Sequence, residues 1–144
     1  RSLVTAVEKN PKSLYVLKKN IILHNLQTRI FPVIRDLFPP SGNAFDMIVS
    51  NPPYISEKEW HELEPGIKDY EPKEALLAGQ DGTEILQQIA EQSRFYLKPA
   101  GKLLLEIGYN QKAKVERILK GAKFSKIDFF KDYSRIHRVA YAEL

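Results

Sequence analysis

The sequence predicts an α/β protein with an open, largely parallel sheet. Two observations support this fold class: short apolar runs alternate with segments whose apolar residues recur at helical spacing, and the last two runs lie close together. A parallel pair needs a crossover of a dozen or more residues, so we expect an antiparallel pair at the carboxyl end. Parallel strands are normally covered by helices on both faces. A chain of 144 residues has the length of one domain, so we expect residues 1–144 to form a single one.

The first elements follow from local chemistry. Residues 3–7 are an apolar run suited to a buried strand. Asn10 and Pro11 then predict a helix start, because an asparagine side chain caps free N–H groups and proline fits the first turn. Apolar residues at helical spacing carry this helix to about His24, namely Leu14, Leu17 and Ile21.

The later elements are read in the same way. Residues 45–50 form a strand that must stop at Pro52 and Pro53, since two prolines cannot continue a central strand. Residues 54–80 are expected to be irregular. A cap at Asp81 with Glu84 three residues later predicts a helix that ends in a turn at residues 98–101. The remaining expected elements are strands at 29–35, 102–107, 124–130 and 136–143, and a helix at 110–120 that stops at Gly121.

Composition excludes several classes of protein. No apolar run approaches about 18 residues, so no membrane span is expected. The chain has no cysteine, which excludes disulfides and thiolate metal sites and suits a cytoplasmic location. The histidines His24, His61 and His137 lack metal-ligand spacing, so no metal is expected. The net charge is +4, but lysine and arginine are dispersed, which favours a solvated surface over a nucleic-acid site.

Ligands of such sheets bind at the carboxyl ends of the strands, where Glu8 and Asp36 follow the first two runs. Glu8 could accept hydrogen bonds from ribose hydroxyls, or it could be a solvated carboxylate near a helix amino terminus. Asp36 could accept a hydrogen bond from an adenine amino group, with Leu37 against the ring. Asp36 could equally be a turn residue before Pro39. The residues alone leave both pairs of readings open.

Asn51-Pro52-Pro53-Tyr54, after the third strand, is more specific. An amide or aromatic amino nitrogen is a poor nucleophile because its lone pair is delocalised. The Asn51 side-chain oxygen and the Pro52 carbonyl could accept hydrogen bonds from the two N–H groups of this nitrogen and so orient its lone pair. The two prolines would hold both acceptors in place. Tyr54 could pack against the planar group. The alternative is a proline-rich turn that only ends a strand.

This motif lies among segments that together resemble the HemK/PrmC-type release-factor glutamine methyltransferases. The motif alone is also found in DNA adenine and RNA guanine methyltransferases, whereas the combination is specific. The resemblance covers essentially the whole chain and rests on Ser50-Asn51-Pro52-Pro53-Tyr54-Ile55, Glu71-Pro72-Lys73-Glu74-Ala75-Leu76, Gly79-Gln80-Asp81-Gly82 and Gly101-Lys102-Leu103-Leu104-Leu105-Glu106-Ile107-Gly108.

The resemblance implies a Rossmann-like class I fold, S-adenosylmethionine as cofactor, and methylation of a glutamine side-chain amide in a peptide chain release factor. Asn51 and the Pro52 carbonyl would bind that amide beside Pro53 and Tyr54, with Asn51 also facing the cofactor. By the same resemblance Glu8 would hold the cofactor ribose, and Asp36 with Leu37 would frame its adenine.

The family places a glycine-rich loop and a small helical domain ahead of the residue that Glu8 matches. Here the sequence starts seven residues before Glu8. The resemblance therefore implies that residues 1–144 are the carboxy-terminal portion of a catalytic domain truncated at its amino terminus, which we expect to be inactive alone.

Two other functions are compatible with the sequence. The exocyclic amino group of a base in RNA or DNA presents the same two hydrogens as an amide, so a nucleic acid is the alternative substrate. A non-catalytic binding module with a methyltransferase fold is the second alternative. The absent glycine-rich loop favours the module, and the intact motif at Asn51 favours an enzyme.

Overall fold

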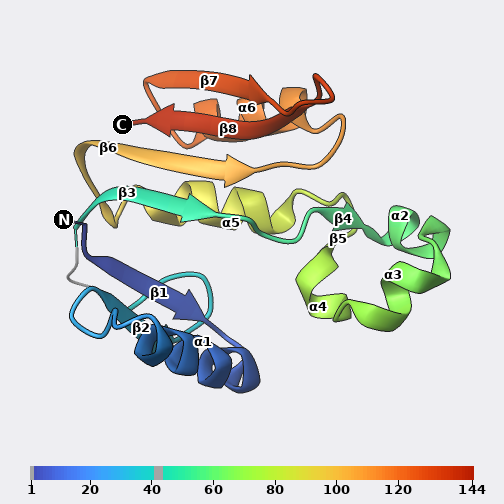
Figure 1. The fold of residues 1–144 in the computed structure, drawn as a ribbon. Helices are drawn as coiled ribbons and strands as arrows, with labels where there is room; N and C mark the ends of the chain where they lie inside the picture. Colours follow the sequence, from blue (N-terminus) through green and yellow to red (C-terminus); the bar gives the residue numbers. More distant parts are fainter. Residues whose placement is uncertain (1, 41–43) are drawn as a thin grey trace. The chain divides into compact units, whose positions relative to one another are not determined.

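A computed structural model describes residues 2–40 and 44–144 (Figure 1). The chain divides into two compact units, Arg1–Asn43 and Ala44–Leu144.

The first unit pairs two strands beside one helix. β1 (Val4–Glu8) and β2 (Ile30–Ile34) are parallel. Between them runs α1 (Pro11–Leu23), where the Asn10 side chain accepts a hydrogen bond from the Lys12 N–H at 2.8 Å. This cap and the proline at the first turn confirm the predicted helix start.

The second unit contains a four-stranded sheet in the order β3-β6-β8-β7. β3 and β6 are parallel, whereas β8 runs antiparallel to both β6 and β7, which confirms the predicted terminal pair. The strands are β3 (Phe45–Ser50), β6 (Leu97–Glu106), β7 (Lys126–Lys131) and β8 (His137–Glu143).

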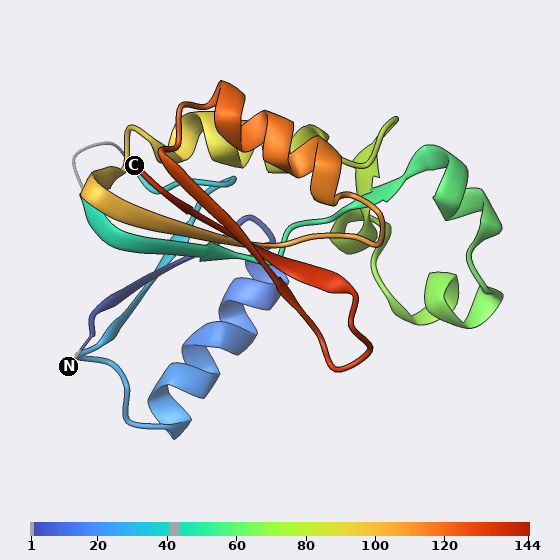
Figure 2. The same cartoon turned by 90° about the horizontal axis from the view of Figure 1, so that it is seen from above.

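Two helices cover this sheet on one face, α5 (Glu84–Ser93) and α6 (Lys112–Gly121) (Figure 2). The sequence predicted helices on both faces of the sheet. Within residues 44–144, helices cover one face. The core consists of aliphatic side chains from the strands and these helices, including Leu86, Ile89, Leu103, Leu105, Val115 and Leu119.

The predicted turn at residues 98–101 was wrong. α5 ends at Ser93, and β6 already begins at Leu97. Leu97 is buried, and pairing shifts from Phe45↔Leu97 to Met47↔Lys102, so the turn-like residues are a bulge within a strand. Ala100 has a φ of 59°, which accommodates that bulge.

The prediction that residues 54–80 are irregular was also wrong. Short elements occupy this segment because each begins at a cap or a proline. Ser56 and Glu59 form a capping box at the first helix, and Pro65 starts the second. The elements are β4 (Ile55–Ser56), α2 (Glu57–Glu62), α3 (Pro65–Tyr70), α4 (Lys73–Leu76) and β5 (Leu77–Gly79), with β4 and β5 parallel.

The start of α5 differs in detail from the expected cap. Thr83, not Asp81, is the capping residue, and its side chain makes no cap hydrogen bond. The Glu84 carboxylate instead accepts hydrogen bonds from the backbone N–H groups of Asp81 at 2.7 Å and Thr83 at 2.9 Å. The predicted role of Glu84 in capping is therefore confirmed, whereas the predicted capping role of Asp81 was wrong.

We expect Glu84 to make stability fall in acid. Burial acts to raise the pKa of Glu84, but hydrogen bonds from backbone N–H groups outweigh it and hold the pKa below its ordinary value of 4.5. A lowered folded-state pKa means that the stabilisation is complete above the unfolded pKa and is lost as pH falls through the folded one. Denaturant unfolding at several pH values measures this effect. Below about pH 4.5, the free energy of unfolding of Glu84→Gln should depend less on pH than that of the unaltered protein. The exposed Glu64→Gln is the control, and an equal effect from it would contradict this role.

Candidate functional site

The first unit brings Glu8 and Asp36 to the same edge of its sheet. Glu8 pairs with Ile34 at the carboxyl ends of two adjacent parallel strands, and Asp36 follows two residues later. The Glu8 Oε1 accepts a hydrogen bond from the Asn10 N–H at 2.7 Å. The Asp36 carboxylate is exposed and makes no hydrogen bond to the described residues, and Leu37 turns the chain with a φ of 57°. Two acceptor groups at one strand edge fit the hydroxyl and amino donors of a nucleoside.

The second unit carries the Asn51-Pro52-Pro53-Tyr54 motif at the tip of β3. Ser50 still pairs with Leu105, and the strand ends there as the two prolines dictate. The Asn51 side chain is exposed and has no hydrogen-bond partner in the described parts of the chain, whereas Pro52 is buried. The motif therefore presents a free carboxamide on a buried, rigid support.

Tyr54 is fixed by its hydroxyl. This group donates a hydrogen bond to Glu106 Oε1 at the carboxyl end of β6, at 3.4 Å. Burial, and then the Glu106 carboxylate, raise the pKa of Tyr54, while Arg138 acts in the opposite direction. The phenol consequently stays protonated at neutral pH and can keep donating.

Gln111 was missed by sequence reasoning. Its side chain is 8% exposed, and its Nε2 donates to the backbone carbonyls of Tyr54 at 2.9 Å and Gly82 at 3.0 Å. Its Oε1 accepts from the Gly108 N–H at 2.9 Å. In the sequence, Gln111 is simply a polar residue near a helix start, and no spacing distinguishes it.

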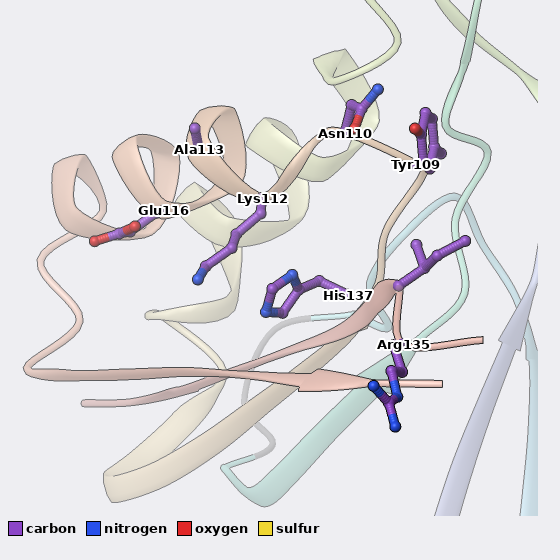
Figure 3. A pocket seen from close by; sticks show the side chains of 8 residues that line it. Tyr109, Asn110, Lys112, Ala113, Glu116, Arg135 and His137 are labelled. Carbon is purple, nitrogen blue, oxygen red and sulfur yellow. The ribbon is translucent and has the colours of Figure 1, made fainter. Parts of the chain in front are cut away.

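Two cavities are lined by residues that follow β6, and one of them also reaches the motif at Tyr54. One of about 390 Å³ is lined by Tyr54, Leu63, Arg138 and Tyr109, among others. Another of about 560 Å³ lies between the start of α6 and β8 (Figure 3). Tyr109 lines both cavities. The first is the one that touches the Tyr54 side chain, where a planar group would stack.

Basic and acidic side chains line the second cavity. Figure 3 shows Lys112 and His137 facing a common space below α6, with Arg135 further away. Glu116, on the same wall, pairs with Lys120 at 2.6 Å. Burial, Lys112 and Lys131 lower the pKa of His137, so it adds little charge at neutral pH.

Two further findings concern only the residues that the structure describes. They contain no group of three or more histidine, aspartate or glutamate side chains placed to hold a metal ion. None of their helices has the length and apolarity needed to cross a bilayer.

Several known proteins similar to this chain are named methyltransferases. No family-wide sequence profile matches it. A release factor glutamine methyltransferase of Fusobacterium nucleatum is 38% identical over 99% of the chain, which covers 40% of that protein. A protein of the same name from Aquifex aeolicus is 38% identical over 96% of the chain and 49% of its own length. The chain thus spans less than half of these relatives.

The fold is shared with solved structures. A methyltransferase from Pyrococcus furiosus matches with a TM-score of 0.68 at 18% identity, over 98% of this chain and 62% of that one. This similarity, with the strand order found here, confirms the predicted Rossmann-like class I methyltransferase fold. The sequence similarity over nearly the whole chain identifies it as a homologue of the HemK/PrmC-type release factor glutamine methyltransferases, corresponding to less than half of their length.

Proposed function

We propose that the protein carrying this sequence is an S-adenosylmethionine-dependent N-methyltransferase that modifies a glutamine side-chain amide of a peptide chain release factor. One observation carries the proposal: an exposed Asn51 carboxamide stands on a buried proline at the tip of a parallel strand, beside a fixed tyrosine. The names of the relatives support the choice of substrate. The expected cytoplasmic location, and residues 1–144 as part of one catalytic domain, belong to this proposal.

The chain's own residues would work by positioning. The Asn51 side-chain oxygen and the Pro52 carbonyl accept hydrogen bonds from the two N–H groups of the amide nitrogen, so that its lone pair faces the methyl donor. Pro53 keeps the acceptors rigid, and the Tyr54 ring packs against the planar amide. The proton released from nitrogen passes to solvent, so no side chain is assigned as a general base.

Residues of the first unit would hold the cofactor. Glu8 would accept hydrogen bonds from the ribose hydroxyls, and Asp36 would accept one from the adenine amino group, with Leu37 against the ring. S-adenosylmethionine, when bound, supplies a sulfonium methyl that is already strongly electrophilic.

Methyl transfer from labelled cofactor tests the proposal. The protein at its full encoded length is incubated with a release factor, with the same factor carrying alanine at the modified glutamine, and with structured RNA. We expect label in the first sample only, and mass spectrometry of peptides should place the methyl group on a glutamine side chain. Label in RNA, or label retained after the glutamine is replaced, would overturn the proposed substrate.

A further inference from the structure

Gln111 ties together three segments that are distant in sequence. Its carboxamide uses both amide hydrogens and its oxygen, contacting the carbonyls of Tyr54 and Gly82 and the N–H of Gly108. These partners lie after β3, before α5 and after β6.

The two glycines allow this amide to approach. A Cβ on Gly82 would lie 2.7 Å from the Tyr54 carbonyl oxygen and 3.1 Å from Gln111 Nε2. A Cβ on Gly108 would lie 3.0 Å from Gln111 Cδ and 3.0 Å from the Tyr54 ring. The backbone and ring of Tyr54 and the Gln111 carboxamide therefore pack against both glycines with no space for a methyl group. This close packing leaves Gln111 and Tyr54 one arrangement relative to each other.

The span that would bind substrate is held at both ends. Ser50 is fixed by pairing with Leu105, and the Tyr54 carbonyl is fixed by Gln111. Between them lie only Asn51 and the two prolines, whose φ angles are restricted by their rings. The position of the Asn51 and Pro52 acceptors therefore depends on where Tyr54 is anchored.

We propose that Gln111 is a positioning residue for methyl transfer, holding the Tyr54 end of the Asn51–Tyr54 span so that the two acceptors meet the substrate nitrogen. This inference rests on the proposed function above. Three backbone groups occupy the hydrogen-bonding atoms of the Gln111 carboxamide, so it acts through the backbone of Tyr54. An amide is required, because a glutamate carboxylate has no hydrogens to donate to the two carbonyls.

The test compares Gln111→Met, which keeps the volume and loses the polar contacts, with Gln111→Glu, which keeps the acceptor and loses both donors when ionised. Gln88→Met, on the exposed side of α5, is the matched control. The full-length protein is assayed for kcat and KM with release factor, and each kcat is normalised to the number of cofactor-binding sites. A displacement of about 1 Å can cost about 100-fold in rate, so we expect kcat to fall roughly 10- to 100-fold with KM and cofactor affinity nearly unchanged.

A purely structural role predicts a different result. The variants would then unfold at lower temperature while each folded molecule kept the original kcat, and that outcome would overturn the inference. Gln111→Glu decides the question if Gln111→Met does not fold. Failure of the unaltered protein to methylate the factor would instead refute the proposed function, so the two failures are distinguishable.

Discussion

Asn51→Ala is expected to lower kcat for release-factor methylation by at least about 100-fold while leaving cofactor affinity within about twofold. The alanine lacks the side-chain oxygen that would accept a hydrogen bond from the substrate amide nitrogen. The Pro52 carbonyl alone cannot orient both N–H groups of that nitrogen. The Asn51 side chain makes no hydrogen bond to the described residues, so its removal should not disturb the fold. Steady-state kinetics and calorimetric titration with S-adenosylmethionine measure the two quantities.

Asn20→Ala is a suitable control, since Asn20 is an exposed residue of α1 far along the chain from the motif. It should leave both quantities unchanged. Unchanged turnover in Asn51→Ala itself would mean that the Asn51 side chain does not orient the substrate amide. A parallel loss of cofactor affinity would mean that Asn51 serves the cofactor more than the substrate.

Leu103→Ala should strongly destabilise the fold. Leu103 is fully buried in β6, at the centre of the four-stranded sheet. Its truncation removes apolar contacts and leaves a cavity, which typically costs about 2–5 kcal/mol of unfolding free energy. Denaturant unfolding followed by circular dichroism measures this loss.

The adjacent residue provides a control. Leu104 points to the opposite face of the same strand and is only half-buried, so Leu104→Ala should cost clearly less. Equal losses would mean that the two faces of β6 are equally buried, in contradiction to the arrangement described above.

Local chemistry explains what the sequence predicted well. Asn10 and Pro11 start α1 by contacts within a few residues, and the prolines after Asn51 end β3 because they cannot continue a ladder. Neither outcome needs knowledge of distant segments. The strand-end positions of Glu8 and Asn51 followed from the same local signals.

The errors arose where distant contacts decide the structure. β4 and β5 contain two and three residues, too few to show an alternating pattern, and they form by pairing with each other. Gln111 bonds to Tyr54 and Gly82, which lie 57 and 29 residues away. Lys98 and Pro99 resemble a turn locally, but Leu97 and Lys102 on either side of them pair with β3, so they form a bulge within the strand.

A crystal structure of the full-length protein with S-adenosylhomocysteine and a glutamine-containing release factor would show which groups bind the substrate amide. We expect the glutamine amide nitrogen within about 3 Å of both the Asn51 side-chain oxygen and the Pro52 carbonyl, with the Tyr54 ring against the amide plane. A glutamine bound elsewhere, or an Asn51 side chain turned away from it, would contradict the proposed function.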